Sequence, residues 1–475
     1  MAHGLVTPGR TFRDRAARAL DDPGLQQALR NLDVRLGTAA EVERDHRDLK
    51  DRAAAIRRET LADLDGWLDR LEGALVARGV TVHRCATPAE ARGVVADVAR
   101  RVGAHVVVKS KSMATEEIDL AEALEAVGFD AVETDLGEYV VQVAGERPSH
   151  IITPVIHKTL EQVAAVLSEE ADEALPVDRE ALTDWVRTHL RQRFLDAGLG
   201  VTGANFAVAE TGTLVIVTNE GNGRFCTALP RVHVAVVPVE KVIPRFADLA
   251  TLLPVLTRSA TGQRLSNYVS MISGPRRAGE HDGPEELHVV LLDHGRRRLI
   301  GTPYEAMLAC IRCGACLNVC PVYRRVGGHA YDSVYPGPMG EVLTPLLSAG
   351  LSGRDLPSAS TLCGACTEAC PVEIPLADLI ARLRADLRAP DPVAPGSRRP
   401  RLRRSAFGLW ARVWSSRRGY RLSTTLARVV GAGQGGGEAA IRWRRRLPGV
   451  GGWTATRDLP VPARRRFRDQ WSSRS

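Results

Sequence analysis

The chain has 475 residues, of which 44% are hydrophobic and 25% are charged. This composition excludes a disordered or fibrous protein, and the length predicts two to four folded domains. The net charge of +8 is unevenly distributed, because residues 391–475 contain 20 Arg, no Lys and four acids, a net +16 that leaves −8 on the preceding 390 residues. A basic tail behind an acidic body predicts an anionic partner for the tail, which is a protein, a membrane surface or a nucleic acid.

The sequence predicts a cytoplasmic protein. No apolar segment follows Met1, and no run reaches the roughly 18 uncharged apolar residues that a membrane span needs, although peripheral contact with the inner face of a membrane is left open. Because the cytoplasm is reducing, the nine cysteines are expected to be metal ligands or catalytic thiols and not a disulfide framework. Seven of the nine lie between Cys310 and Cys370, which indicates one metal-bearing module.

Residues 1–75 are predicted to be helical. Leu64, Leu68, Leu71 and Leu75 recur there at the spacing of one helix face, as in an amphipathic scaffold.

From residue 76 to residue 298 the sequence predicts an α/β domain with a mostly parallel sheet, because short β-branched runs alternate with helical stretches. The predicted strands are residues 104–108, 131–133, 149–153, 232–237 and 287–292, and the predicted helices include residues 118–127 and 160–167. Two alternating runs, residues 205–210 and 213–217, flank a Thr-Gly pair and predict a hairpin.

The cysteine module begins with Cys310, Cys313, Cys316 and Cys320, followed by Pro321. This is the C-x2-C-x2-C-x3-C-P run with which bacterial ferredoxins hold a [4Fe–4S] cluster. Three thiolates at steps of three residues can surround one cubane, and the proline turns the chain so that the fourth sulfur points toward a second cluster.

A second run carries Cys363, Cys366 and Cys370 before Pro371, with Ser360 in place of its first cysteine. If ligation crosses as it does in two-cluster ferredoxins, Cys310, Cys313, Cys316 and Cys370 hold the first cluster, and Cys320, Cys363 and Cys366 hold the second. The second site is one thiolate short. It therefore holds either [3Fe–4S], or [4Fe–4S] with Ser360, water or a partner's ligand on the open iron.

Zinc is the alternative to iron–sulfur clusters, since it also favours C-x2-C pairs. Two tetrahedral zinc sites need eight ligands, so seven thiolates fit them poorly, and zinc binding does not explain why both runs end in Cys-Pro. Residues 340–351 are predicted to be helical, which favours a helical two-cluster ferredoxin. Cys85 and Cys226 stand apart from the module, and Cys226 is interpreted as a small buried hydrophobe.

Several common catalytic motifs are missing from the sequence, namely G-x-x-x-x-G-K-[ST], G-x-G-x-x-G and H-E-x-x-H. Polar residues do gather at the ends of the predicted strands, where open parallel sheets bind ligands, so they are candidates to line one pocket for an anionic substrate. They are residues 109–113, 116–117, 133–135, 150, 157–158 and 219–222. Taken singly, each is better explained as a cap, a turn residue or part of a solvated edge.

The basic tail contains five of the seven tryptophans among its arginines. Phe407, Trp410 and Trp414 are predicted to share one helix face. Such a face binds a nucleic acid, an anionic membrane, the acidic body of this chain or a partner subunit. Docking on protein is favoured, because the tail has no recognisable nucleic-acid module.

Three segments resemble the lactate utilization protein B family: KSKSMATEEI from Lys109, GANFAVAETGTLVIVTNEGNGR from Gly203, and CIRCGACLNVCPVYRRVGGHAY from Cys310. The resemblance extends over nearly the whole chain, including WTATRDLPVPARRRFRDQW from Trp453. It implies N-terminal helices (residues 1–75), an α/β LUD domain similar in fold to the CoA-transferase and sugar-phosphate-isomerase group (76–298), an α-helical dicluster ferredoxin-like domain (299–388) and a mostly helical or irregular basic C-terminal region (389–475).

The resemblance implies an iron–sulfur electron-transfer subunit of a system that oxidises L-lactate to pyruvate. It also implies two partners, a cysteine-rich protein resembling heterodisulfide reductase subunits and a second LUD protein. It places the cluster ligands on the seven cysteines of the module, makes Ser360 a feature of the family, and transfers no catalytic residue. The electron acceptor is left open.

Two other functions are kept as hypotheses. One is the iron–sulfur subunit of another 2-hydroxy-acid or glycerol-phosphate dehydrogenase. The other is a metal-containing, nucleic-acid-binding regulator that uses the basic tail.

Overall fold

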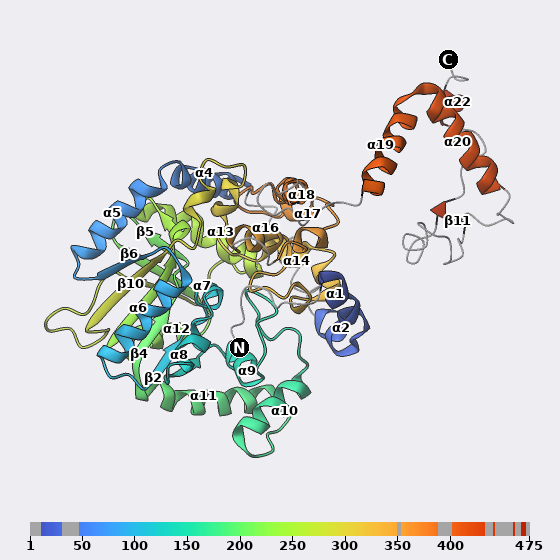
Figure 1. Cartoon of the computed structure of the whole chain (residues 1–475). Coiled ribbons are helices and arrows are strands. Elements are labelled where there is room, and N and C mark those ends of the chain that lie inside the picture. Colours follow the sequence, from blue (N-terminus) through green and yellow to red (C-terminus); the bar gives the residue numbers. More distant parts are fainter. Residues whose placement is uncertain are drawn as a thin grey trace. The chain divides into compact units, whose positions relative to one another are not determined.

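A computed structural model describes residues 11–30, 47–348, 353–387, 401–432, 440–441, 459–460 and 467–471. The chain divides into two compact units, Met1–Arg388 and Ala389–Ser475 (Figure 1). Within the described ranges, no helix combines the length and the apolar character that a membrane crossing requires.

The first unit is built around a six-stranded sheet in the order β1-β10-β7-β4-β2-β3, and every neighbouring pair is parallel. The strands are β1 (Thr81–Cys85), β2 (Val106–Lys109), β3 (Asp130–Glu133), β4 (Ala197–Thr202), β7 (Val232–Pro238) and β10 (Glu286–Leu292). The α/β class and the parallel sheet expected from the sequence are therefore confirmed.

Both faces of this sheet are buried, because successive side chains of a strand point to opposite sides. In β7, Val234 and Val236 pack with helix α6 (Pro88–Arg101), whereas Ala235 and Val237 pack with helix α5 (Leu64–Val76). Figure 1 shows helices on both sides of the strands.

A smaller sheet of four strands lies beside the first, in the order β8-β5-β6-β9. Its strands are β5 (Phe206–Val208), β6 (Thr213–Thr218), β8 (Val242–Ile243) and β9 (Tyr268–Ile272). Strands β5 and β6 form the predicted hairpin, and Gly212 adopts the positive φ of 64° that its turn requires.

The remaining helices of the first unit connect these strands or follow them. The α-helices are α1 (Phe12–Asp21), α2 (Pro23–Arg30), α4 (Arg47–Ala62), α7 (Met113–Glu117), α8 (Leu120–Glu125), α9 (Leu136–Val143), α10 (Leu160–Ala171), α11 (Arg179–Asp196), α12 (Asn222–Ala228), α13 (Leu249–Thr261), α14 (Ala315–Val319), α15 (Tyr323–Val326), α16 (Gly337–Leu347), α17 (Ala365–Glu368) and α18 (Leu376–Asp386). Short 3₁₀ helices are η1 (Val239–Lys241), η2 (Phe246–Asp248), η3 (Arg297–Leu299), η4 (Glu305–Ala309), η5 (His329–Tyr331) and η6 (Leu356–Ala359).

Several features of the fold differ from the sequence prediction, and strands β1, β8 and β9 were not among the predicted strands. Residues 149–153 form bends and not a strand, because the His150 ring accepts hydrogen bonds from the backbone amides of Ile152 and Thr153 and folds the chain locally. Strand β4 was not predicted, because its two glycines interrupt the run of β-branched and apolar residues that indicates a strand. Gly200 is needed there, since a Cβ atom at this position would lie 1.9 Å from the Cys226 carbonyl oxygen.

The cysteine-rich region packs into the same hydrophobic core as the smaller sheet. This core joins Phe206 and Val215 of the sheet, Leu252 of α13, and Leu317 and Val342 of the cysteine-rich region. The sheet domain and the cysteine module are therefore built onto each other and not merely connected in sequence.

Arg57 on α4 holds this junction. Its fully buried guanidinium donates hydrogen bonds to four backbone carbonyls, those of Val242, Glu240, Leu308 and Ala309. Burial lowers the pKa of Arg57 to about 10, so it stays protonated at neutral pH.

The second unit contains helices α19 (Arg401–Ser415) and α20 (Arg417–Ala432), the short strands β11 (Ala440–Ile441) and β12 (Leu459–Pro460), and helix α22 (Phe467–Trp471). Trp410 and Trp414 stack with ring centroids 5.3 Å apart, and both are about half exposed.

Replacing Arg57 by methionine is expected to lower the free energy of unfolding by about 3 kcal/mol or more, because buried carbonyls lose their donors. Urea unfolding followed by circular dichroism measures the change. The neighbouring Arg58→Met is the control: Arg58 forms an exposed ion pair with Glu373 and should change the free energy by about 0–1 kcal/mol. Equal effects of the two substitutions would contradict the role given to Arg57.

Candidate functional site

The two cysteine runs share one backbone shape. In the first run, Arg312 and Gly314 on either side of Cys313 have φ of 63° and 80°. In the second run, Leu362 and Gly364 on either side of Cys363 have φ of 57° and 87°. Non-glycine residues in this left-handed region are rare and persist where the surroundings impose them, often at ligand sites. Each run then continues into a short helix, α14 or α17, and ends at a Cys-Pro pair.

Four thiols from the two runs are neighbours in the structure. Burial raises the pKa of Cys316, and the nearby thiols of Cys310, Cys313 and Cys370 raise it further. Burial likewise raises the pKa of Cys313 to about 12, with Cys370 and Cys310 adding to the effect. Cys370 comes from the second run, so the fold brings it beside the first three cysteines of the first run.

The other three thiols form a second group. Burial raises the pKa of Cys366 to about 11, and the nearby Cys320 and Cys363 raise it further. Cys363 is exposed, and the backbone amide of Ala365 lowers its pKa. This group therefore lies at the surface on the side of Cys363, whereas Cys320 is buried.

Backbone amides also point at two of the sulfurs. The amide of Tyr323 donates to Sγ of Cys320 at 3.4 Å, and the amide of Ile374 donates to Sγ of Cys370 at 3.3 Å. Such bonds stabilise thiolates and tune the reduction potential of an iron–sulfur cluster.

Among the described residues, the thiols are not gathered as tightly as the ligands of a single zinc ion. With Zn–S bonds of about 2.3 Å, four tetrahedral thiolates lie about 3.8 Å from one another. Among the described residues, no cysteine belongs to a set of three ligand atoms within 4.8 Å of one another. A cluster of several irons and sulfides separates its thiolates more widely than a single ion does, so the two wider groups are consistent with it.

Two residues near the second group have oxygen atoms that could bind iron, Ser360 and Glu341. Ser360 takes the place of the missing cysteine in the sequence, and its Oγ accepts a hydrogen bond of 3.1 Å from the Leu362 amide. Glu341 on α16 is fully buried, and neither of its carboxylate oxygens has a hydrogen-bond partner among the described residues. Burial raises the pKa of Glu341 to about 8, and its charge acts on Cys320 and Cys366. The sequence analysis missed this residue.

Cations surround the group of four. Arg57, Arg312 and Lys241 interact electrostatically with Cys310, and Lys50 does so with Cys313 and Cys370. These charges compensate the negative charge that four thiolates and a bound cluster would bring into a buried site.

A cavity of about 250 Å³ lies at the carboxyl ends of β2, β3, β4 and β7, where parallel sheets collect ligands. Residues that follow these strands line it, among them Ser110, Asp135, Asn205 and Lys241. The smaller sheet and α13 form another part of its wall. The cysteine module closes it through Arg312, which lies between Cys310 and Cys313, and through Tyr335.

Two of the lining residues have unsatisfied hydrogen-bonding atoms. Arg312 donates from Nη2 to Glu240 at 2.9 Å, but its buried Nη1 has no partner among the described residues. The buried Oδ1 of Asn222 also lacks one. Burial, together with Arg312, lowers the pKa of Lys241 to about 7. Since buried polar groups are normally paired, these atoms are available to water or to a polar ligand in the cavity.

The structure brings only part of the predicted polar set into this cavity. Of the strand-end residues, Ser110, Lys111, Ser112, Met113, Asp135, Asn219, Glu220 and Asn222 line it. Arg312 and Tyr335 were not predicted, because they lie 74 or more residues beyond the ends of these strands in sequence.

Lys109 lies outside the cavity, in a buried ion-pair cluster. Its ammonium donates to Glu116 at 2.7 Å and to Glu133, and Glu138 is close by. Burial alone would lower the pKa of Lys109, but the three carboxylates raise it overall, whereas burial raises the pKa values of Glu133 and Glu138.

Glu117 has a structural role as well. It pairs with the fully buried Arg296 through both carboxylate oxygens, and it accepts a hydrogen bond of 2.5 Å from the Tyr335 hydroxyl. Burial alone would raise the pKa of Glu117, but Arg296 lowers it overall.

The other predicted residues lie elsewhere. His150 is buried, with Nε2 3.3 Å from Oδ1 of Asn318, and His157 and Lys158 contact Glu146. Cys226 is fully buried, and burial raises its pKa to about 12. This agrees with the interpretation of Cys226 as an unreactive core residue.

Family models match most of the chain. Residues 68–292 match the LUD domain, residues 306–374 match the 4Fe-4S dicluster domain, and residues 382–475 match the model described as lactate utilisation protein B, C-terminal.

Curated relatives match nearly all of it. The chain is 42% identical to lactate utilization protein B of Bacillus velezensis, over 98% of this chain and 97% of that protein. It is 41% identical to lactate utilization protein B of Bacillus subtilis strain 168, over 98% and 96%. It is 44% identical to the protein named "Uncharacterized electron transport protein YkgF" of Escherichia coli K12, over 80% of this chain and 81% of that one.

The two cysteines outside the module are expected to be dispensable for iron binding. In the double variant Cys85→Ala, Cys226→Ala, the iron content and the EPR spectrum of the reduced protein should equal those of the wild type. In the native protein at pH 8, iodoacetamide should modify neither thiol within minutes, because both are buried and burial raises both pKa values. Loss of iron from the double variant would show that a ligand has been misassigned.

Proposed function

The chain belongs to the lactate utilization protein B family, and we propose that it is the iron–sulfur electron-transfer subunit of a system that oxidises L-lactate to pyruvate. The observation that carries the proposal is the assembly of seven thiols into a group of four and a group of three within one buried module. Clusters bound there supply one-electron steps, which can link a two-electron oxidation to a one-electron carrier.

The ligands of the first cluster are Cys310, Cys313, Cys316 and Cys370, and those of the second are Cys320, Cys363 and Cys366. The first cluster is [4Fe–4S], and the second is [4Fe–4S] or [3Fe–4S]. The thiol neighbours of Cys316 and Cys366 support this division.

The cavity of the LUD domain is the place for a small carboxylate, the substrate or its oxidised product. Its cationic groups are Lys111, Lys241 and Arg312, against the acids Asp135 and Glu220. A carboxylate is an acceptor for the unpartnered Nη1 of Arg312. A molecule held there lies beside the loop of Cys310 and Cys313, so its charge acts on the first cluster site.

Partners complete the system in this proposal. They are a cysteine-rich subunit resembling heterodisulfide reductase and a second LUD protein, with an electron acceptor on one of them or beyond. The exposed Trp410 and Trp414 of the basic tail serve to dock on protein. The relatives do not favour another 2-hydroxy-acid or glycerol-phosphate dehydrogenase, nor a nucleic-acid-binding regulator.

Replacing single ligands is expected to remove the clusters selectively. Cys313→Ala should abolish the EPR signal of the first cluster, whereas Cys363→Ala should change the signal of the second and leave that of the first. Iron analysis and EPR of anaerobically purified, dithionite-reduced protein measure both. Ser358→Ala is the control on the second run and should change neither. Full iron content and unchanged spectra in both cysteine variants would refute the proposal.

Binding of lactate or pyruvate is expected to weaken as the pH rises. The carboxylate pairs with protonated Lys241, whose pKa is lowered to about 7, so raising the pH from 6 to 8.5 should reduce the affinity roughly ten-fold or more. Burial raises the pKa of Glu220, and its ionisation would act in the same direction. Calorimetry on the iron-loaded protein measures the affinity at each pH.

Two variants test this assignment. Lys241→Met should bind weakly at every pH, with most of the pH dependence lost. Thr261→Val, which changes an uncharged residue of the same cavity, should keep the pH slope of the wild type. An unchanged slope in Lys241→Met would show that Lys241 does not contact the carboxylate.

A further inference from the structure

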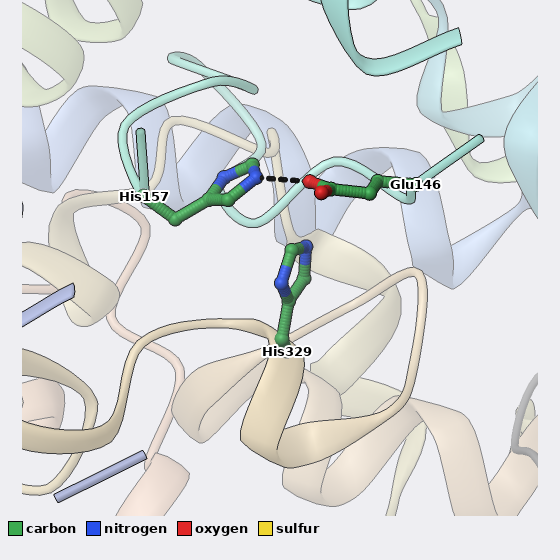
Figure 2. A group of neighbouring side chains, drawn as sticks. All are labelled: Glu146, His157 and His329. Carbon is green, nitrogen blue, oxygen red and sulfur yellow. Dashed lines mark hydrogen bonds and ion pairs between the residues drawn. The ribbon is translucent and has the colours of Figure 1, made fainter. Parts of the chain in front are cut away.

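Glu146, His157 and His329 bring two imidazoles and a carboxylate together, and none of the three is a cysteine of the module or lines the cavity. One ligand atom of each lies within 4.8 Å of those of the other two. Glu146 and His157 belong to the segment between α9 and α10, and His329 begins η5 of the cysteine-rich region. Figure 2 shows His157 facing Glu146, with the His329 ring approaching the pair from a different segment.

His329 and Glu146 are each held by a hydrogen bond that leaves one of their atoms available to bind a metal ion. Nε2 of His329 lies 2.6 Å from the carbonyl oxygen of Arg147, so it carries the proton and Nδ1 keeps a free lone pair. The ammonium of Lys158 donates to Oε1 of Glu146 at 2.7 Å, which leaves Oε2 for a second partner. Metal-binding histidines and carboxylates are held by outer contacts of these kinds.

His157 supplies the third donor. Its Nε2 lies 2.7 Å from Oε2 of Glu146, and its buried Nδ1 has no hydrogen-bond partner among the described residues, although only 8% of the side chain is exposed. Burial and the neighbouring His329 lower the pKa of His157 to about 4, so the ring is neutral at pH 7. Burial alone would raise the pKa of Glu146, but Lys158 and His157 lower it overall. A neutral imidazole and an ionised carboxylate are the forms that bind metal ions.

The two segments are fixed relative to each other without an ion. The Tyr323 hydroxyl donates to the Ser149 carbonyl oxygen at 2.7 Å, and a Cβ atom at Gly328 would lie 1.8 Å from the same oxygen. The rings of His157 and His329 have centroids 4.3 Å apart. The donor set is therefore formed in advance and needs only side-chain adjustments.

We propose that Glu146, His157 and His329 bind one divalent transition-metal ion of the zinc class, with solvent completing its coordination. Zinc with bonds of about 2.0–2.1 Å places tetrahedral N and O ligands about 3.3 Å apart. This value lies between two distances of the structure. Nε2 of His157 is 2.7 Å from Oε2 of Glu146, and all three ligand atoms lie within 4.8 Å of one another. The ion lies between Glu146 and Nε2 of His157, so the proton of the neutral His157 ring moves to Nδ1. The ion joins the LUD domain to the cysteine-rich region. None of its three ligands is a cysteine of the module.

The test uses the iron-loaded protein, purified anaerobically and desalted, with ZnCl2 as the probe. Zinc and iron per chain are measured by elemental analysis after a second desalting, and affinity is measured by calorimetry. The wild type should retain one zinc per chain with its iron unchanged. His329→Asn, which removes the ring but offers a donor to the Arg147 carbonyl, should weaken binding at least about ten-fold, as should Glu146→Gln.

The matched control is His281→Ala, which removes an exposed histidine from the loop between β9 and β10 and should bind zinc like the wild type. Equal zinc binding by the wild type and His329→Asn would overturn the proposal and leave an ion-pair cluster only. Zinc uptake matched by loss of iron would overturn it as well, because the ion would then be bound by the cysteine thiols.

Discussion

The central part of the first unit is held together by ion pairs of the buried Glu240 carboxylate. Glu240 follows β7, is fully buried, and pairs with Arg312 at 2.9 Å and with Arg296 at 2.6 Å. Arg296 in turn pairs with Glu117 beyond β2, and the Glu240 carbonyl accepts a hydrogen bond from Arg57. Removing one member of such a buried chain leaves an uncompensated charge, so the members fix one another. The chain of contacts links the sheet, the N-terminal helices and the first cysteine pair.

This arrangement explains why the cysteine module could be predicted from the sequence, whereas the cavity that it lines together with the sheet could not. Ligand spacing in the run from Cys310 is local, and it is a known pattern of cluster-binding chains. Parallel strands such as β7 are also visible, because burial on both faces requires continuous apolar residues. The partners of the Glu240 carboxylate, Arg296 and Arg312, lie 56 and 72 residues away in sequence, and nothing in the local pattern indicates which arginine pairs with which acid.

The same reasoning explains the individual errors and omissions. Residues 149–153 have β-branched residues typical of a strand, but hydrogen bonds to the His150 ring outweigh that propensity. Lys109 was a candidate for a substrate pocket, but its ammonium forms ion pairs with carboxylates that are brought together only in the folded domain. Glu341 sits in an apolar helix, where sequence gives no sign that its carboxylate is buried beside Cys320 and Cys366.

Arg312 has two roles that follow from its position. Its backbone, with φ of 63°, is part of the loop that presents Cys310 and Cys313, and its side chain is part of the cavity wall. A charge that enters the cavity therefore acts on the first thiol group through a medium of low polarity, where electrostatic interactions are stronger than in water. Because Glu240 holds the guanidinium in place, the cavity and the cysteine loop cannot shift independently. In the function proposed here, a molecule bound in the LUD domain would therefore act on the cysteine module through this one side chain.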